Sequence, residues 1–413
     1  MKLIKKLLYA GLCLPGLIHA ATTIHDADRL AVTPSLSLHD VVEITRQRNP
    51  KIDVIKARLA HADAQLKSTD SLWSSDPSFS INNYNDVIMS NNGLQEWEAG
   101  VEMPIWLPGQ KTARQKTAQM ELQAVNASAS VLELELAGVV RELLWSIALS
   151  QNHVSLAEQE WKTVQQLAHD VEKRVKLGDL AQSDLILAKQ ESLSKEAVFH
   201  QAQQEFLLAQ HRYDLITGLV EIPANFSETA TTELSIDDEH PALQEARDKV
   251  ANQNALRDQV KIEKRGNPSL FVGTRHERGT SNEDFTNAIS LSFTMPFGTS
   301  AYTTPKITAA EVSLSEARSD MELLYRDLNI ALQDADRELH VAQEQYEFAK
   351  RNNDLAQRYL ELSRKAFALG ETSLIELIRI QAQAFASERN LHQRQLEIGL
   401  RTARLNQAKG IIP

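Results

Sequence analysis

The stretch ALGETSLIEL, residues Ala368 to Leu377, decides the fold because it interrupts an unusually long run. Between Lys306 and Leu369 the chain contains neither glycine nor proline, the two residues that most disfavour a helix. A helix over that run would be about 100 Å long at 1.5 Å per residue. Gly370 can adopt the positive φ that ends a helix, and Ser373 can start the next one. We therefore predict a long helical hairpin that turns at Gly370.

The same pattern occurs earlier in the chain, which predicts an internal repeat. Three pairs of segments match: KLGDLAQSDL (176–185) with ALGETSLIEL (368–377), VEMPIW (101–106) with FTMPFG (293–298), and RNPKIDVIKARL (48–59) with EHPALQEARDKV (239–250). The interval from Gly178 to Gly370 recurs between the prolines of the second pair. We divide the chain into a first repeat, 21–225, and a second repeat, 226–413, each with a helix, two strands, a very long helix and a returning helix.

The first twenty residues, MKLIKKLLYAGLCLPGLIHA, predict export. Lysines precede a short apolar core that ends in a small residue, Ala20, as in a cleaved signal peptide over 1–20. Cys13 is the one cysteine of the chain, so the mature protein would have no thiol for a disulfide or a metal site. Lipidation of Cys13 is the alternative, and the bulky Leu12 before it argues against that. No later stretch approaches 18 consecutive apolar residues, so we expect no transmembrane helix.

Composition and motifs argue against nucleic-acid binding and against catalysis. The chain has 44 lysines and arginines against 55 aspartates and glutamates, and its net charge of −11 offers no basic face for phosphates. It has no glycine-rich phosphate loop, no GxSxG and no HExxH motif. The histidines are scattered, and we expect them to be solvated or at interfaces. We therefore predict no enzyme activity, no catalytic residues, no cofactor and no metal site.

Two segments alternate apolar and polar residues, the pattern of a β-strand with one apolar face. They are EWEAGVEMPI (96–105) and FTNAISLSFTMPF (285–297), and their expected partners are PSFSINNYN (77–85) and PSLFVGTRH (268–276). Strands of about ten residues with this alternation are typical of transmembrane β-strands, and a soluble sheet packed on a core is the alternative. The residues that we expect to face lipid are Trp97, Val101, Met103, Ile289, Leu291 and Phe293.

Four such strands cannot close a membrane barrel, whose smallest form has about eight. Open strand edges would leave backbone groups unpaired in lipid, so we expect several chains to share one barrel. The loops 86–95 and 277–284 join the strands in pairs. The expected strand-to-helix junctions are Pro104, Pro108, Gly109, Pro296 and Gly298.

Small apolar residues are expected to pack the long helices together. Steps of three and four residues, the spacing of a coiled coil, connect Ala317, Met321, Leu324, Leu328, Ala331, Ala335, Leu339, Ala342, Tyr346 and Ala349. The opposite faces are rich in charged and amide side chains, which we expect to remain solvated.

Together these features resemble the TolC-type outer membrane efflux proteins. The signal peptide, the tandem repeats, the two strands and two long helices of each repeat, and the glycine turns carry the resemblance, which covers essentially the whole mature chain. Within that family, the segment MPIWLPGQKTAR (103–114) is similar to the heavy-metal branch, the cobalt-zinc-cadmium or CzcC-like type. Outside the family, a periplasmic adaptor would have one hairpin flanked by soluble β domains, and a structural coiled coil would lack the strands.

The resemblance implies a mainly α fold with a small β part. Very long coiled-coil helices would form a periplasmic α-barrel, and three chains with four strands each would form a 12-strand barrel in the lipid of the cell outer membrane. This homotrimer would work with a periplasmic membrane fusion (adaptor) protein and an inner membrane resistance-nodulation-division pump. The implied function is export of heavy-metal cations from the periplasm or cytoplasm. Export of drugs and other organic compounds, or type I protein secretion, is the alternative.

The resemblance also implies that the helical turns form the periplasmic gate. The family's gate acid lies six residues after the turn glycine, which gives Glu376 after Gly370 and Asp184 after Gly178. Three copies of Glu376 around one axis would favour cations. The alternative is that Glu376 only completes a capping box with Ser373. We do not expect capping by Asp184, because Ala181 stands in place of the serine. The expected ion-pair partners in the closed state are Arg379 and Lys189.

Overall fold

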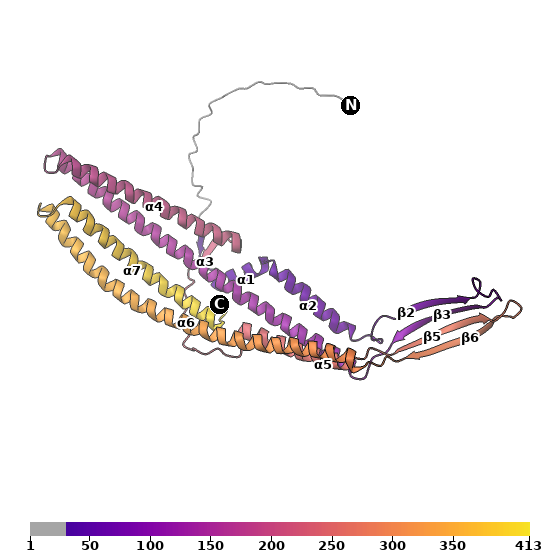
Figure 1. Cartoon of the computed structure of the whole chain (residues 1–413). Coiled ribbons are helices and arrows are strands. Elements are labelled where there is room, and N and C mark those ends of the chain that lie inside the picture. Colours follow the sequence, from indigo (N-terminus) through magenta and orange to yellow (C-terminus); the bar gives the residue numbers. More distant parts are fainter. Residues whose placement is uncertain (1–29) are drawn as a thin grey trace, which may run out of the picture.

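The structure is a computed structural model that describes residues 30–413. The expected signal peptide, 1–20, and Cys13 lie outside the described residues. The molecule is long and curved, with helical hairpins at one end and a small sheet at the other (Figure 1). Among residues 30–413, no helix has both the length and the apolar character needed to cross a membrane.

Two very long helices form the shaft of the molecule. α3 (Gln110–Lys176) has 67 residues, and α6 (Ser300–Ala368) has 69. Each turns back into a helix of 36 residues, α4 (Gln182–Thr217) after α3 and α7 (Leu374–Lys409) after α6. Both turns lie at the end of the molecule that is opposite to the sheet (Figure 1). The two long helical hairpins expected from the sequence are therefore confirmed.

α6 begins earlier than the sequence suggested. We expected it from Lys306, after the last proline, whereas it starts at Ser300 with Thr299 as its N-cap and Pro305 inside it. A proline within a helix removes the backbone hydrogen bond to the carbonyl four residues before it. Because Pro305 lies near the start of the helix, only this one bond is lost and little helix precedes it to be bent.

The buried stripe of α6 follows the predicted spacing with one difference. Leu332, Leu339 and Ala342 are buried, whereas Ala331 is exposed. Leu332 takes the place that we gave to Ala331, because a leucine buries more apolar area than an alanine at the adjacent position. The stripe packs against Leu243 of α5 (Pro241–Glu263) and Leu405 of α7.

Three further helices surround the shaft. α1 (Leu38–Arg48) starts with a capping box, in which Ser37 and Asp40 each bond the backbone N–H of the other, and it packs on α3 and α4 around Tyr213. α2 (Lys51–Ser68) packs on α3, α3 on α5 (Pro241–Glu263), and α5 on α6. The shaft near the sheet is thus a layer in the order α2, α3, α5, α6.

The sheet at the far end has four antiparallel strands in the order β2-β3-β5-β6. Their bounds are Ser78–Asn85 (β2), Gln95–Pro104 (β3), Ser269–Arg278 (β5) and Thr286–Thr294 (β6). The two expected hairpins are joined through β3 and β5, which leaves β2 and β6 at the edges. A second, parallel pair of strands, β1 (Ala31–Thr33) with β4 (Glu221–Pro223), was not expected, because three residues carry too little pattern.

Candidate functional site: a two-faced sheet and the hairpin tips

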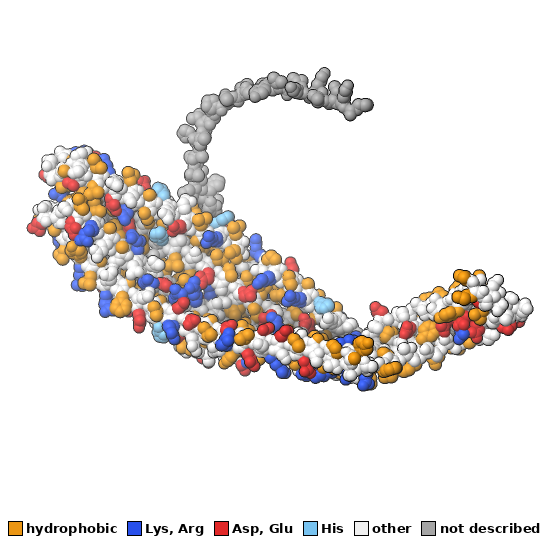
Figure 2. Space-filling model, in the orientation of Figure 1, with side chains coloured by type: hydrophobic (Ala, Val, Ile, Leu, Met, Phe, Trp, Pro, Cys, Tyr) orange, Lys and Arg blue, Asp and Glu red, His pale blue; other side chains and the backbone are white. Residues whose placement is uncertain are grey.

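The pairing of the strands gathers apolar side chains on one face of the sheet. Val101 lies opposite Phe79 on β2 and Val272 on β5, and Val272 lies opposite Leu291 on β6. Residues directly opposite each other share a face. The six residues that we expected to face lipid all lie on this face, together with Phe79, Ile81, Leu270 and Val272. Several are widely exposed, Ile289 to 82% and Leu291 to 70%, and Figure 2 shows hydrophobic side chains at the surface of the sheet region.

The other face of the sheet is polar and carries four glutamates, Glu96, Glu98, Glu102 and Glu277. Arg275 pairs with Glu96 and with Glu277, at 2.7 Å each. Ser290 donates a hydrogen bond to Glu98 and Ser269 donates one to Glu102, both at 2.5 Å. Glu96, Glu98 and Glu102 lie on β3 in the first repeat, whereas Glu277 and the two serines lie on β5 and β6 in the second. The polar face is therefore built from both repeats. The sequence missed the network because it did not show that β3 pairs with β5.

An aromatic ring covers two glycines on this polar face. Gly100 and Gly273 are opposite each other, and Phe271 lies two residues before Gly273 on the same strand. A Cβ atom on Gly100 would collide with the Phe271 ring, and one on Gly273 would lie 2.9 Å from it. The ring therefore fills the space that the two missing side chains leave.

The junctions between the sheet and the shaft differ between the repeats. Pro108 and Gly109 separate β3 from α3, and Gly109 is the N-cap of α3 with φ +77°. Gln110 is fully buried and donates to Glu263 and to Asn267, at 3.0 and 3.1 Å. Pro104 is the last residue of β3, and Pro296 and Gly298 lie between β6 and α6. There Phe297 is 90% exposed and Tyr302 77% exposed.

The turns at the hairpin tips have the same geometry. Gly178 has φ +85° and Gly370 has φ +78°. Each glycine N–H bonds a carbonyl three residues back, and the next N–H bonds one five residues back, which is the Schellman ending of a helix. Within the described residues, a Cβ on either glycine would meet no atom within 4 Å. The glycines are therefore required by backbone conformation and not by space.

The two acidic residues after the turns differ in their partners, and the pair of Glu376 with Arg379 is the one that we expected. Glu376 donates its backbone N–H to the Ser373 hydroxyl (3.3 Å), while its carboxylate accepts from Arg379 at 2.6 and 3.0 Å. Hydrogen bonds from Arg379 lower the pKa of the Glu376 carboxyl. The carboxylate of Asp184 instead accepts from the backbone N–H of Ala181, at 3.3 Å. Our reason for excluding capping by Asp184 was wrong, because a carboxylate can cap the N–H of an alanine.

Lys189 lies away from Asp184. Its ammonium group is nearest Glu172 of α3, at 4.0 Å. The tips of the two hairpins touch through a contact that we did not expect, in which the Arg174 guanidinium lies over the Phe367 ring, 5.0 Å from its centre, and donates to the Phe367 carbonyl. Around this contact an apolar cluster joins the hairpins and includes Ala168, Val171, Leu185, Ala188 and Leu374.

Solved structures share this arrangement. The outer membrane protein VceC from Vibrio cholerae is 14% identical with a TM-score of 0.73, over 90% of this chain and 96% of that one. CusC is 15% identical with a TM-score of 0.74, over 91% and 92%. The outer membrane channel CmeC from Campylobacter jejuni is 14% identical with a TM-score of 0.71, over 97% and 94%. The fold is that of the TolC-type outer membrane channels. No family model and no curated protein matches the sequence.

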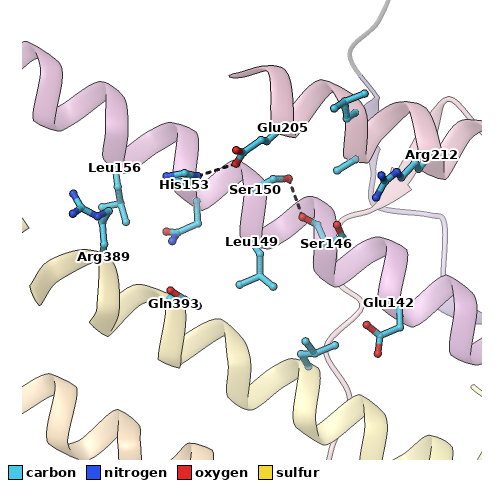
Figure 3. Close-up of a pocket in the computed structure, with 14 residues that line it drawn as sticks. Glu142, Ser146, Leu149, Ser150, His153, Leu156, Glu205, Arg212, Arg389 and Gln393 are labelled. Carbon is cyan, nitrogen blue, oxygen red and sulfur yellow. Dashed lines mark hydrogen bonds and ion pairs between the residues drawn. The ribbon is translucent and has the colours of Figure 1, made fainter. Parts of the chain in front are cut away.

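A groove lies in the shaft between α3, α4 and α7 (Figure 3). Its lining includes Ser146, Leu149 and His153 of α3, Glu205 of α4, and Gln393 of α7. His153 lies 3.4 Å from Glu205, and on α6 His340 lies 3.8 Å from Asp336. These two histidines are therefore paired with carboxylates rather than only solvated. Among residues 30–413, no three His, Cys, Asp or Glu side chains form a group that could hold a metal ion.

Proposed function

We propose that this chain is the outer membrane channel subunit of a tripartite efflux system, and that it exports heavy-metal cations. The observation that carries the proposal is the sheet, which has one apolar face, one polar face and two open edges. The sheet lies at one end of helices that are each about 100 Å long at 1.5 Å per residue. That length suits a protein that reaches from one membrane toward a partner in another.

The open edges support assembly into a homotrimer. In the part of the chain that the structure describes, β2 and β6 each have one neighbouring strand. A lipid-exposed edge would leave backbone N–H and C=O groups unpaired, so β6 of one chain would pair with β2 of the next. Three chains would then supply enough strands to close a membrane barrel, with the apolar face toward lipid and the polar face toward the lumen. The exposed Phe297 and Tyr302, beside the β6 edge, would be covered by the neighbouring chain.

The hairpin tips would form the opposite, periplasmic end of the channel. There they would meet a membrane fusion (adaptor) protein and a resistance-nodulation-division pump of the inner membrane. Glu376 and Asp184 lie just after the turns, so three chains would bring their carboxylates around the entrance. The Arg379 side chain pairs with Glu376 in this structure. As long as this ion pair is formed, it would reduce the negative charge of the ring of carboxylates.

Cations are the proposed cargo for two reasons. The polar face of the sheet has four glutamates against one arginine, which is a negative lining for a lumen. The segment 103–114 is similar to the heavy-metal branch of these channels. Cargo is chosen largely at the pump, so the channel itself is expected to discriminate by charge and not by the identity of the metal.

Growth of a deletion strain tests this proposal. The strain is grown on graded zinc, cobalt, cadmium and copper, beside a panel of dyes and antibiotics, and is complemented with the wild-type gene. Hypersensitivity confined to one or more metals supports the proposal and identifies the cargo. Sensitivity confined to organic compounds would still support the role as a channel, but it would show that the cargo is organic compounds and not metal cations. Chemical cross-linking of the purified protein, which should stop at trimers, tests the assembly separately.

A further inference from the structure

The apolar face of the sheet changes character at one level across all four strands. Going from the shaft toward the loops, the last mainly apolar row consists of Ile81, Ala99, Thr274 and Ile289, which lie opposite one another. The next row, two residues farther along each strand, consists of Asn83, Trp97, His276 and Asn287. Polar and aromatic side chains therefore replace aliphatic ones at the same height in both repeats.

One row beyond, Arg278 places a positive charge on the same face. It lies opposite Gln95, two residues after His276 on β5. Its guanidinium carbon lies 4.8 Å from the centre of the Phe285 ring, and the His276 ring stacks on the same ring, with centres 4.1 Å apart. The Nδ1 of His276 in turn donates to the Oδ1 of Asn287, at 2.6 Å. An aromatic ring with a fixed position therefore holds the arginine at the end of the sheet.

In the part of the chain that the structure describes, Arg278 has no acidic partner. Both ion pairs of the sheet use Arg275, which lies on the polar face. In the adjoining loop, the carboxylate of Glu283 accepts from the Gly279 N–H at 2.9 Å. The Nε of Arg278 is buried and has no hydrogen-bond partner among residues 30–413. A buried polar group without a partner is unfavourable, so this guanidinium group is suited to bind an anion.

We propose that Arg278 binds the phosphate of a lipid head group, at the level where the apolar part of the sheet ends. This inference rests on the proposed function, in which the apolar face meets lipid. A charge on the lipid face is costly at the middle of a membrane and much less costly near its surface. The place of Arg278 therefore fits the head-group level, and Trp97, one row away, is typical of that level. Arginine can also give one phosphate two parallel hydrogen bonds.

The surroundings of Arg278 indicate which leaflet supplies the lipid. Arg278 is the last residue of β5, at the end of the molecule that is opposite to the hairpin tips (Figure 1). In the proposed channel the tips are periplasmic, so this end of the sheet reaches the outward leaflet. Ile81 and Ile289, which are 60% and 82% exposed, would contact the acyl chains of the lipid, and a free phosphate ion has no such chains. The ligand is therefore an outward-leaflet lipid with an exposed phosphate group.

Quenching of Trp97 fluorescence by brominated lipids tests the proposal. The protein is reconstituted in phosphatidylcholine vesicles that contain either brominated phosphatidic acid or brominated phosphatidylcholine. Trp73 and Trp106, which lie outside the helices and strands near the base of the sheet, are replaced by phenylalanine. Trp145 and Trp161 lie in α3 and give a constant background. We expect phosphatidic acid to bind beside Trp97 about fivefold more strongly than phosphatidylcholine, the effect of one cationic side chain at a membrane surface.

Substitutions on β5 show whether Arg278 causes this preference. Arg278→Gln should remove the preference, and Arg278→Lys should keep most of it. Arg275→Gln is the matched control, because it removes a positive charge from the polar face of the same strand and should leave the preference unchanged. A full preference in Arg278→Gln would overturn the site, as would equal quenching by the two lipids before any change at Arg278.

Two further outcomes separate this site from the proposed function. If inorganic phosphate displaces phosphatidic acid at constant ionic strength, the ligand is a soluble phosphate and the assignment to lipid is wrong. If neither brominated lipid quenches Trp97, the apolar face does not meet lipid, and the proposed membrane role fails together with the site. Quenching by both lipids without preference removes the Arg278 site alone and leaves the membrane role supported.

Discussion

Arg141 of α3 and Glu228, in the segment between β4 and α5, form a two-pronged ion pair with N···O distances of 2.8 and 2.6 Å. The arginine side chain is only 3% exposed, and it also donates to Gln407 and to the Ile411 carbonyl. One buried cation thus ties the segment between β4 and α5 to both hairpins. We predict that Arg141→Met destabilises the protein by about 3–5 kcal/mol, because the variant leaves the Glu228 charge without its partner.

Urea unfolding of the purified protein, followed by circular dichroism, measures the Arg141→Met effect. Arg326→Met is the control, since Arg326 pairs with Asp327 on the surface with both side chains more than 60% exposed. That control should change the free energy of unfolding by less than about 1 kcal/mol. Equal losses in the two variants would contradict the assigned role of Arg141.

The glycine pair of the sheet predicts a rescue experiment. Gly100→Ala should lower the yield of folded trimer, because the new Cβ collides with the Phe271 ring, and overpacking of this kind costs about 1–3 kcal/mol. Phe271→Ala in the same chain removes the contact with the ring and should recover part of the yield, whereas the contact with the Gly273 Cα, at 2.7 Å, remains. Trimer yield is read from the heat-sensitive band on gels of mildly solubilised membranes. A double variant that is worse than Gly100→Ala would contradict this account.

Adjacent residues on β6 test which face meets lipid. Leu291→Lys places a charge on the apolar face and should cost about 2–4 kcal/mol if that face lies at the middle of the membrane. Ser292→Lys places the same charge one residue later on the polar face, where we expect folded protein at near wild-type levels. Outer membrane levels of the two variants are compared by immunoblot. The opposite ranking would show that the polar face meets the lipid.

The tip glycines predict that the stability of each turn depends on how readily the residue at that position adopts a positive φ. Gly370→Ala should destabilise the turn by about 1 kcal/mol, since alanine disfavours the positive φ that the Schellman ending requires. Gly370→Asn should cost less, because asparagine tolerates this conformation better than alanine does. Hydrogen exchange of the amides around the turn measures the difference. Faster exchange in the asparagine variant than in the alanine variant would contradict the explanation.

The pair of Glu376 with Arg379 predicts how cation preference depends on pH. The hydrogen bonds from Arg379 lower the pKa of the Glu376 carboxyl below its usual range, so its charge is lost only as the pH falls through that lowered value. In Arg379→Gln the carboxyl should protonate at a higher pH, nearer the usual range of a glutamate. Reversal potentials between pH 6 and pH 3 should therefore lose cation preference at a higher pH in the variant. Identical pH profiles, or an unchanged preference in Glu376→Gln at neutral pH, would exclude Glu376 as a selectivity residue.

The long helices, their turns and the two-faced strands were predictable because each depends on neighbours in sequence. A run with no proline and a single glycine, Gly138, sets the extent of α3, and Gly178 sets its end. The alternation around Val101 and Leu291 sets the apolar face, whichever strands pair. Two predictions of this kind were wrong: α6 starts before Pro305, and Ala331 is exposed. The start of a helix, and which of two adjacent residues is buried, depend on the parts of the chain that pack nearby.

The contacts between the hairpins were not predictable, because they join residues that are distant in sequence. Glu160 meets Arg389, and Arg174 meets Phe367, only after both hairpins have formed and aligned. No local pattern marks any of these four residues. Asp184 was misjudged for a different reason: we considered only the missing serine hydroxyl, and not the carboxylate bond to the Ala181 N–H.

The two edges of the sheet come from different repeats, β2 from the first and β6 from the second. Copies that associate through them form a heterologous, head-to-tail contact, in which each new chain presents the same free edge as the one before. Such a contact does not by itself fix how many copies join. Whether the series ends in a closed ring or continues is decided by the angle between successive chains, and therefore by the curvature of the sheet and of the α2, α3, α5, α6 layer that supports it.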